Sequence, residues 1–463
     1  MKISIFIDAL DPRDVQKYCP KMALDMKGKY DVGVPRVTPN IVSQAMTGLP
    51  PEDMEMIRST PMFEPGKESV WETEEGEPKS VDSGPERDGI GDPVQGERRV
   101  GVHRYQNILD DLDSQGVTLF QYGTPFCAFV ELDNGLSVHD EMTNPAVPGF
   151  MEFVSPQTSF KDDDWDLVAD SYISDTVLHF ETLKQITRQG NMDAIFLGYK
   201  HIDHCTHWYA PDIKRDLIKV IWSYIEDLRE MGHEVMWWSD HGSQSKKEVF
   251  RINKWLHENE YLKYDVDLQF LEQARNKGMI EQSFDEQVQL QSPVVEVDWE
   301  SSVAYSSDAF DSLVDVTPHA SDGQINQLVQ DLGSHPATAN VWRKGEYLDP
   351  EGEKFWYAPE IIVERDDNVL VTGNIHPDAS TYISDVPEDW EDFQEDNMGM
   401  RPGVHSRYGC YGGDIPEDTD ISEPCELRDV MYDFVDPENI ESGNVDTDIS
   451  QAAEERLEDL GYI

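Results

Sequence analysis

Basic residues are scarce in this chain. Only 37 of its 463 residues are Lys or Arg, whereas 93 are Asp or Glu, and the formal net charge is −56. Surfaces that bind DNA, RNA or anionic membranes need clustered Lys and Arg, so the charge balance excludes all three as broad partners. The acidic residues are spread along the whole chain and do not gather in one tail. This distribution is typical of a protein from a halophilic organism, in which a high net charge maintains solubility.

Cysteine is also rare, and long apolar runs are absent. No two cysteines are spaced as CxxC, which argues against a disulfide scaffold or a zinc ribbon. The five cysteines are Cys19, Cys127, Cys205, Cys410 and Cys425. No window approaches the roughly 18 continuous apolar residues of a membrane-spanning helix. The first apolar run, Ile3 to Ile7, is too short for a signal peptide, so we expect a cytoplasmic protein without a membrane span.

What the chain does contain is enough apolar material for a folded core, since 38% of its residues are hydrophobic. Three apolar runs are typical of buried strands: Ile3–Ile7, Asp193–Tyr199 and Glu234–Trp238. Apolar residues recur at helical spacing between Leu217 and Met231, and a second helix is predicted over roughly 167–189. Strand, helix, strand in this order indicates a βαβ unit. We predict an α/β fold, a three-layer sandwich with a largely parallel central sheet.

Acidic and histidine side chains follow each of the three predicted strands. Asp8 follows the first strand, Asp203 and His207 follow the second, and Asp240 and His241 follow the third. Ligands in open α/β sheets gather at the carboxyl ends of the strands. Mixed carboxylate and imidazole ligands suit Zn²⁺ or Mn²⁺ better than Ca²⁺. The sequence therefore predicts a metal site at this edge of the sheet.

A short helix is predicted from Thr38 to Gly48. Thr38 is a good N-cap, Pro39 fits the first helical position, and Gly48 fits the position after the helix end. Free backbone N–H groups and the positive end of the helix dipole would favour a phosphate near the Thr38 hydroxyl. Thr-Pro also caps many helices that have no catalytic role, so spacing alone leaves both interpretations open.

Taken together, these segments resemble the alkaline phosphatase superfamily, in its type I phosphodiesterase and nucleotide pyrophosphatase branch. The resemblance spans essentially the whole chain, and its motifs occur in the order of the family. They are Ile7-Asp8-Ala9-Leu10, Thr38 with Thr47-Gly48, the D-x-x-x-H-x-x-x-P stretch from Asp203 to Pro211, Ser239-Asp240-His241-Gly242, and Gly403-Val404-His405-Ser406. The SDHG motif with an upstream D-x-x-x-H is the most specific part.

The resemblance implies a phosphoester hydrolase with two divalent metal ions, zinc or manganese, acting on a small phosphate ester. One metal would be held by Asp203, His207 and His405. The other would be held by Asp8, Thr38, Asp240 and His241, with Thr38 as the nucleophile that attacks phosphorus. Two other histidines, His376 and His319, are alternatives to His405 as the last ligand.

The sequence also departs from the pattern of that branch. Nucleotide pyrophosphatases carry Asn three residues after the nucleophile, whereas Ile41 stands there and Asn40 is one residue early, so Asn40 is a candidate phosphate-binding residue. A phosphomutase or phosphotransferase of the same superfamily is an alternative function, as is a non-catalytic metal-stabilised module. A sulfatase is disfavoured because the chain contains no C/S-x-P-x-R run.

The predicted domain organisation follows the resemblance. Residues 1–245 form the N-terminal part of the catalytic α/β core, with a mobile acidic insertion at 64–100. Residues 246–400 form an insertion or small cap with returning core strands, of which the charged stretch up to about 301 has a helical texture. Residues 401–463 return to the core and carry His405, and the oligomeric state stays open.

Overall fold

The computed structural model describes residues 1–33, 38–50, 106–124, 132–138, 165–189, 192–207, 211–245, 247–267, 295–306, 313–347, 359–373, 375, 381–385 and 403–440. The insertion predicted at 64–100 lies outside these residues, as does His376. The chain divides into two units. The first consists of Met1–Pro51, Pro93–Gln244 and His405–Ile463, and the second of Glu52–Asp92 and Ser245–Val404.

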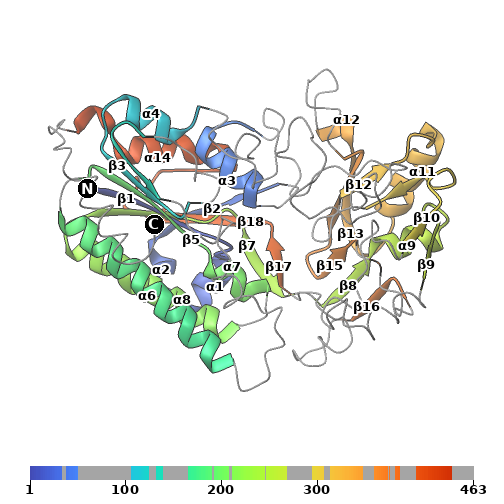
Figure 1. The fold of residues 1–463 in the computed structure, drawn as a ribbon, viewed down its shortest axis with the longest axis horizontal. Coiled ribbons are helices and arrows are strands. Elements are labelled where there is room, and N and C mark those ends of the chain that lie inside the picture. The colour runs from blue at the N-terminus through green and yellow to red at the C-terminus, as the bar shows by residue number, and fades with distance from the viewer. Residues whose placement is uncertain are drawn as a thin grey trace, which may run out of the picture. The chain divides into compact units, whose positions relative to one another are not determined.

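The first unit is built on a seven-stranded sheet with the order β2-β18-β6-β1-β5-β3-β4 (Figure 1). Its strands are β1 (Lys2–Ile7), β2 (Met26–Asp31), β3 (Leu119–Tyr122), β4 (Gly135–Val138), β5 (Ala194–Tyr199), β6 (Glu234–Trp238) and β18 (Tyr408–Gly413). Strands β6, β1, β5, β3 and β4 are parallel, and β18 pairs antiparallel with both of its neighbours. The predicted fold class, α/β with a largely parallel central sheet, is confirmed.

The register of the central strands decides where their ends lie. Ile7, the last residue of β1, is opposite Tyr199, the last residue of β5. Phe6 of β1 is opposite Trp238, the last residue of β6. Because these strands are parallel, the residues that follow them leave the sheet at one edge. Asp8, helix α7 (His201–His207) and the loop that starts at Ser239 all begin at this edge.

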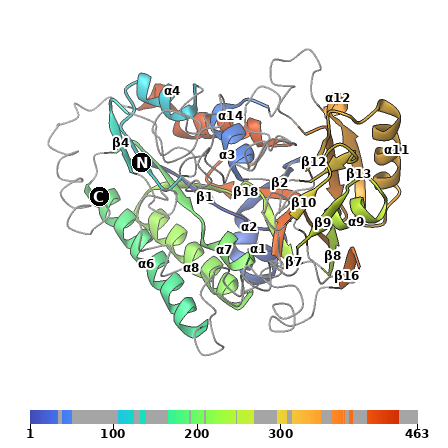
Figure 2. The same cartoon turned by 45° about the vertical axis from the view of Figure 1, so that its right-hand side comes forward.

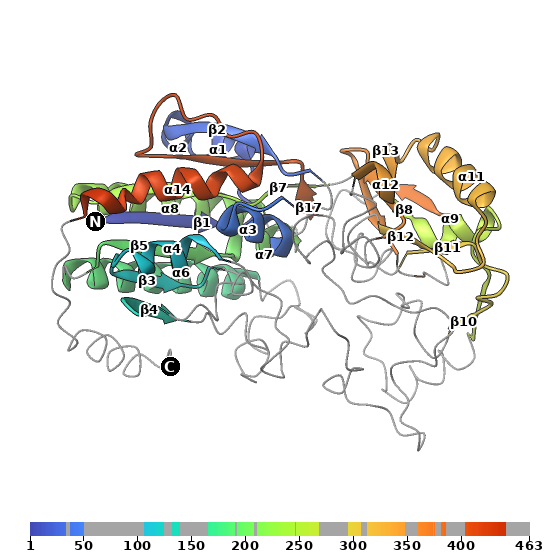
Figure 3. The same ribbon diagram turned by 90° about the horizontal axis from the view of Figure 1, so that it is seen from above.

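Helices cover both faces of the sheet, as Figures 1 and 3 show. One face carries α1 (Pro12–Tyr18), α2 (Pro20–Asp25), α6 (Trp165–Gln189), α7 (His201–His207) and α8 (Pro211–Glu230). The other carries α3 (Thr38–Thr47), α4 (Ile108–Ser114) and α14 (Leu427–Val435), followed by the 3₁₀ turn η9 (Pro437–Asn439) and preceded by η8 (Pro424–Glu426). Alternate side chains of β1 serve the two layers, because Ile5 packs in the first cluster and Phe6 in the second. Across the described helices of the chain, none is both long enough and apolar enough to cross a membrane.

The second unit has a core of its own. Its larger sheet has the order β11 (Ala304–Tyr305), β12 (Leu313–Val316), β14 (Ile361–Arg365), β13 (Thr338–Arg343), and a smaller sheet has the order β15 (Val369–Thr372), β8 (Glu248–Arg251), β16 (Ile383–Asp385). A ribbon pairs β9 (Tyr264–Val266) with β10 (Val295–Val297), and the helices are α9 (Ile252–Glu258), α11 (Asp322–Gly333) and α12 (Lys344–Tyr347) (Figure 2). The helical texture expected after residue 246 is wrong in part, since β8 and β9 flank the short α9 there. Val249 and Phe250 of β8 are fully buried, and their packing outweighs the charged composition of the stretch.

The chain leaves the first unit in β7 (Gly242–Ser245) and returns to it in β17 (Gly403–Ser406), and these two strands pair with each other. Both strands lie at metal-ligand candidates that the sequence predicts. Gly242 comes after His241, and β17 contains His405. The pairing therefore joins two segments that are far apart in the sequence.

Candidate metal centre

Five acidic and histidine side chains converge at the carboxyl edge of the central sheet. They form two overlapping groups, within each of which one ligand atom per residue lies within 4.8 Å of the others. The groups are Asp8 with Asp240 and His241, and Asp203 with His241 and His405. Asp8 follows β1, Asp203 lies in α7 after β5, and Asp240 and His241 follow β6. The parallel strands thus bring together residues from three separate parts of the sequence.

The first group is buried. Asp8 is 5% exposed, and Asp240 and His241 are not exposed at all. His241 Nε2 lies 3.0 Å from Asp240 Oδ2 and 3.7 Å from Asp8 Oδ1. His241 Nδ1 lies 2.9 Å from the carbonyl oxygen of Gly242 and donates to it, which turns Nε2 toward the carboxylates.

The charges of this group oppose one another in the absence of a cation. Burial raises the pKa of Asp8 well above its usual range, and the nearby carboxylates of Asp240 and Asp203 raise it further. Burial also opposes ionisation of Asp240, but His241 outweighs it and lowers the Asp240 pKa. For His241, burial lowers the pKa, and the Asp240 carboxylate more than offsets this, so the His241 pKa is raised. The negative charge of Asp8 is therefore disfavoured at this site without a cation.

These residues fit a divalent cation. Asp8 Oδ1 and Asp240 Oδ2 are buried, and within the described residues neither has a hydrogen-bond partner. Tetrahedral zinc bonds of about 2.0–2.2 Å place neighbouring ligand atoms about 3.3–3.6 Å apart. The separations of 3.0 and 3.7 Å from His241 Nε2 lie close to that range. A cation there would satisfy both orphaned oxygens and neutralise the buried negative charge.

The second group is half-buried. His405 Nε2 lies 3.6 Å from Asp203 Oδ1, and each side chain is 16% exposed. The rings of His241 and His405 stack with centroids 3.7 Å apart and an interplanar angle of 21°. The set expected for this metal also contained His207, which is the last residue of α7 and whose side chain lies outside the described ones. Of the two alternative histidines, His319 is exposed in the second unit.

Thr38 lies beside the first group. Its Oγ1 is 3.1 Å from His241 Nε2, and the residue is half-buried. Thr38 is the first residue of α3, whereas the sequence predicted it as the N-cap just before the helix. Gly48 follows the helix as predicted, with φ of +73°, and its N–H donates to the carbonyl oxygen of Gln44. The backbone of Asn40 is part of α3, and its side chain lies outside the described ones.

The hydrogen bonds that hold these ligands in place were not predicted from the sequence. The N–H of Ala9 donates to Asp240 Oδ1 at 3.2 Å, and Ser243 Oγ donates to the carbonyl oxygen of Ala9 at 2.9 Å. Asp11 contacts both Ser243 and Ser406, the residues next to the SDHG loop and to His405. The Asp11-Pro12 pair signals a helix start in the sequence, but nothing in the sequence signals these distant contacts.

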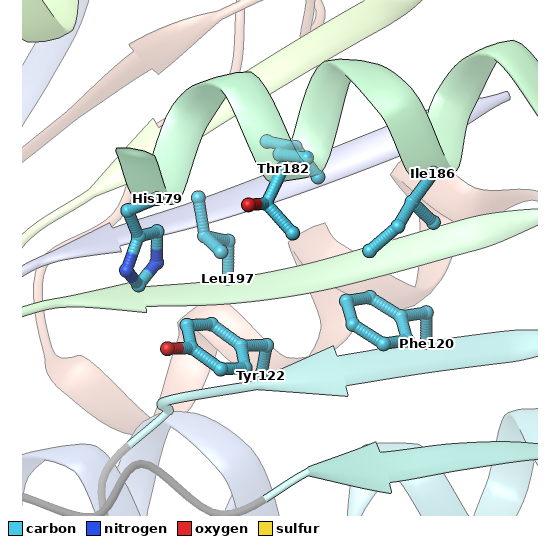
Figure 4. Close-up of a pocket in the computed structure, with 7 residues that line it drawn as sticks. Phe120, Tyr122, His179, Thr182, Ile186 and Leu197 are labelled. Atoms are coloured by element: carbon cyan, nitrogen blue, oxygen red, sulfur yellow. The ribbon is translucent and has the colours of Figure 1, made fainter. Parts of the chain in front are cut away.

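A small apolar pocket lies elsewhere in the first unit, between α6 and the strands β3 and β5 (Figure 4). It is lined by Phe120, Tyr122, His179, Thr182, Leu183, Ile186 and Leu197. The lining contains one imidazole and no carboxylate, so it does not offer the ligand set of a metal site. The edge of the sheet, and not this pocket, is the candidate functional site.

Comparisons with known proteins support the fold. No protein-family model and no curated protein matches the chain. Two solved structures of phosphonoacetate hydrolase from Sinorhizobium meliloti 1021 are similar, one with phosphonoformate at a TM-score of 0.53 and one with phosphonoacetate at 0.52. In both, 12% of residues are identical, and the match covers 94% of this chain and 95% of the other. The wild-type alkaline phosphatase PafA gives a TM-score of 0.47 at 11% identity, over 94% of this chain and 95% of that chain.

The class that fold and site define is therefore a mixed α/β protein with an acid and histidine cluster at the carboxyl edge of its sheet. The two phosphonoacetate hydrolase structures share this fold. At these identities the likeness concerns the fold alone, and the chemistry has to be argued from the side chains.

Proposed function

We propose that this protein is a metal-dependent phosphoester hydrolase in which Thr38 is the nucleophile. One observation carries the proposal: Thr38 Oγ1 lies 3.1 Å from His241 Nε2, at the point where the two acid and histidine groups share that imidazole. A hydroxyl placed against a buried cation site is the arrangement in which a threonine becomes an effective nucleophile.

The two groups would hold two divalent cations. Asp8, Asp240 and His241, with Thr38, would hold one. Asp203 and His405 would hold the other, together with His207 as the resemblance implies. When bound, the cations would lower the pKa of the nucleophile and stabilise negative charge on the attacking and leaving oxygens. We propose zinc, with manganese as the alternative, because both accept carboxylate and imidazole ligands.

The chain's own groups then account for a two-step hydrolysis. Thr38 Oγ1 gives up its proton to solvent and forms a bond to phosphorus as the ester P–O bond breaks. The leaving alcohol departs with that electron pair and takes a proton from solvent. Water then attacks the phosphothreonine, the Thr38–phosphate bond breaks, and Thr38 recovers its proton. Each turnover consumes one water and releases an alcohol and a phosphate. Thr38 opens α3, where free N–H groups favour a bound phosphate, and Asn40 stays a proposed phosphate-binding residue.

The experiment is turnover by metal-loaded protein on a panel of bis(4-nitrophenyl) phosphate, 4-nitrophenyl phosphate and phosphonoacetate. Phosphonoacetate is included because the most similar folds named above belong to hydrolases of that compound. We expect turnover that chelator abolishes and that Thr38→Ala lowers by about 10³-fold or more, whereas Thr38→Ser keeps part of it. Ser223→Ala, an exposed hydroxyl of α8, is the matched control and should have no effect. Metal-loaded wild-type protein that turns over neither of the two 4-nitrophenyl phosphate esters would overturn the proposal.

The setting of the enzyme is also part of the proposal. We propose that the enzyme works in a cytoplasm of high salt, because salt screens the repulsion that a net charge of −56 causes. The same charge disfavours polyanions as substrates. A small phosphate ester can still approach, because two divalent cations make the site locally positive.

A further inference from the structure

Among the described residues, Asp11 is the most completely buried carboxylate that lies close to the metal centre and belongs to neither ligand group. It is 1% exposed and caps α1, since its Oδ1 accepts from the N–H of Arg13 at 2.8 Å. The Arg13 guanidinium also donates to it, from Nε to Oδ1 at 2.9 Å and from Nη2 to Oδ2 at 2.7 Å.

Capping a helix uses only one of the two carboxylate oxygens. The other oxygen, Oδ2, accepts from the N–H of Ser243 at 3.1 Å and from the hydroxyl of Ser406 at 2.7 Å. Ser243 lies two residues after His241, and Ser406 directly follows His405. One oxygen atom therefore joins the two segments that carry the stacked imidazoles, and helix capping does not account for it.

The atoms around Asp11 Oδ2 are closely packed. A Cβ on Gly242 would lie 2.5 Å from both Asp11 Oδ2 and Ser406 Oγ, so only glycine fits between them. Ser243 is held from the other side as well, because the buried Lys214 donates to its hydroxyl and pairs with Asp14. Hydrogen bonds to the Asp11 carboxylate thus fix the two segments to each other.

We propose that Asp11 is a positioning residue that sets His241 and His405 at their stacked separation, and so determines the affinity of the metal centre. The inference rests on the proposed function only in taking these imidazoles as ligands. Groups that orient metal ligands without touching the metal commonly change metal affinity 10- to 100-fold when they are replaced.

The test is metal binding by the Asp11→Asn protein. Asparagine keeps the size of the side chain but loses the charge and replaces one acceptor oxygen with an N–H donor. We expect the affinity for Co²⁺, measured by calorimetry and by its visible absorption spectrum, to fall about 10- to 100-fold. Turnover should fall through kcat, with little change in KM, because substrate contacts are retained.

Asp25→Asn is the matched control. Asp25 also holds an arginine and a neutral donor, since Arg229 Nη2 lies 3.1 Å and Trp237 Nε1 2.9 Å from its Oδ2. It belongs to the same unit and is 19% exposed, but it contacts neither histidine segment. We expect Asp25→Asn to lower the melting temperature and to leave Co²⁺ affinity and spectrum unchanged.

Each outcome decides the matter. Asp11→Asn protein that binds Co²⁺ as tightly as wild type, with the same spectrum, overturns the inference. Wild-type protein that binds metal without turnover sinks the proposed function and leaves this inference standing. If wild type binds no metal, a crystal structure of Asp11→Asn decides, because an unchanged ring separation of 3.7 Å overturns the inference. If Asp11→Asn fails to fold, Ser406→Ala removes one contact only, and an unchanged Co²⁺ affinity overturns the inference there too.

Discussion

The backbone N–H of Ala9 donates a hydrogen bond to Asp240 Oδ1 at 3.2 Å, and Ala9 itself has φ of +59°. A residue with a Cβ in this left-handed region costs about 1–2 kcal/mol. The carbonyl oxygen of Ala9 accepts a hydrogen bond from the Ser243 hydroxyl. Both backbone polar groups of the strained residue are therefore bonded to the segment after β6. The strain lies directly after Asp8, where it turns the chain out of β1 and against the metal centre.

Replacements at Ala9 should separate backbone strain from side-chain packing. Ala9→Gly relieves the strain but adds flexibility to the unfolded chain, so we expect the free energy of unfolding to change by less than about 1 kcal/mol. Ala9→Val adds a β-branched side chain at a positive φ in a fully buried position, and we expect a loss of about 2 kcal/mol or more. Urea denaturation of the two variants measures the difference. Equal stabilities of the Gly and Val proteins would contradict the assignment of strain.

Asp8→Asn should have opposite effects with and without metal. In metal-free protein at neutral pH, the buried Asp8 carboxylate is disfavoured by desolvation and by Asp240, so a neutral amide should stabilise the fold by about 1 kcal/mol or more. Wild-type protein should gain about 2.7 kcal/mol from a cation at 100 times its Kd, and the variant much less. Thermal melts with chelator measure the effect of the substitution without metal, and thermal melts with Zn²⁺ measure its effect with metal. The control is Asp227→Asn, whose side chain is 47% exposed and pairs with Lys184, and it should shift neither melt.

Gly242 is the residue of the SDHG motif whose role is steric. A methyl group there would lie 2.5 Å from Asp11 Oδ2 and from Ser406 Oγ, and neither can move without breaking its hydrogen bond. We expect Gly242→Ala to lower the free energy of unfolding by about 1–3 kcal/mol and to weaken metal binding. Gly323→Ala in α11 is the control, because the added methyl group would meet only Ser321 Oγ at 4.0 Å. That change should be neutral or stabilising by up to about 1 kcal/mol, since alanine favours a helix.

A pH dependence is expected from the pair formed by Asp175 of α6 and His201 of α7. The two side chains are 2.5 Å apart, from Asp175 Oδ2 to His201 Nε2. Burial opposes ionisation of Asp175, but the hydrogen bond from His201 outweighs it, so the Asp175 pKa is lowered on folding. A lowered carboxylate pKa stabilises the fold above the unfolded value of about 3.9, and this contribution is lost as the pH falls through the folded value.

The comparison with Asp175→Asn isolates this contribution. We expect the free energy of unfolding of wild type to exceed that of the variant by about 1.5–3 kcal/mol at pH 6. This difference should disappear as the pH falls below about 4. Urea denaturation of both proteins from pH 6 to pH 3 measures it, with Asp227→Asn as a surface carboxylate for reference. A gap that stays constant across this range would show that the carboxylate charge is not what Asp175 contributes.

The sequence predicts the strand ends well, because three apolar runs followed by Asp8, Asp203 and Asp240 suffice to place those residues at one edge of a parallel sheet. It does not predict how the ligands are held. Asp11 and Ser406 are 395 positions apart, and no local pattern links a helix cap to a serine after His405. Strand β8 was missed for a related reason, since it is stabilised by tertiary burial that its charged neighbours conceal.

Salt should stabilise the protein most steeply at low concentration. With a net charge of −56, unscreened repulsion opposes the compact state. The Debye length falls from about 10 Å at 0.1 M to about 3 Å at 1 M, so most of the screening is complete by 1 M. We expect the melting temperature and the turnover of metal-loaded protein to rise strongly between 0.1 and 1 M KCl (about a tenfold range of ionic strength) and only weakly above it. Sucrose is excluded from protein surfaces but screens no charge, so it should give no such steep initial rise. A melting temperature that is flat from 0.1 to 1 M KCl would mean that repulsion among the acidic residues does not limit stability.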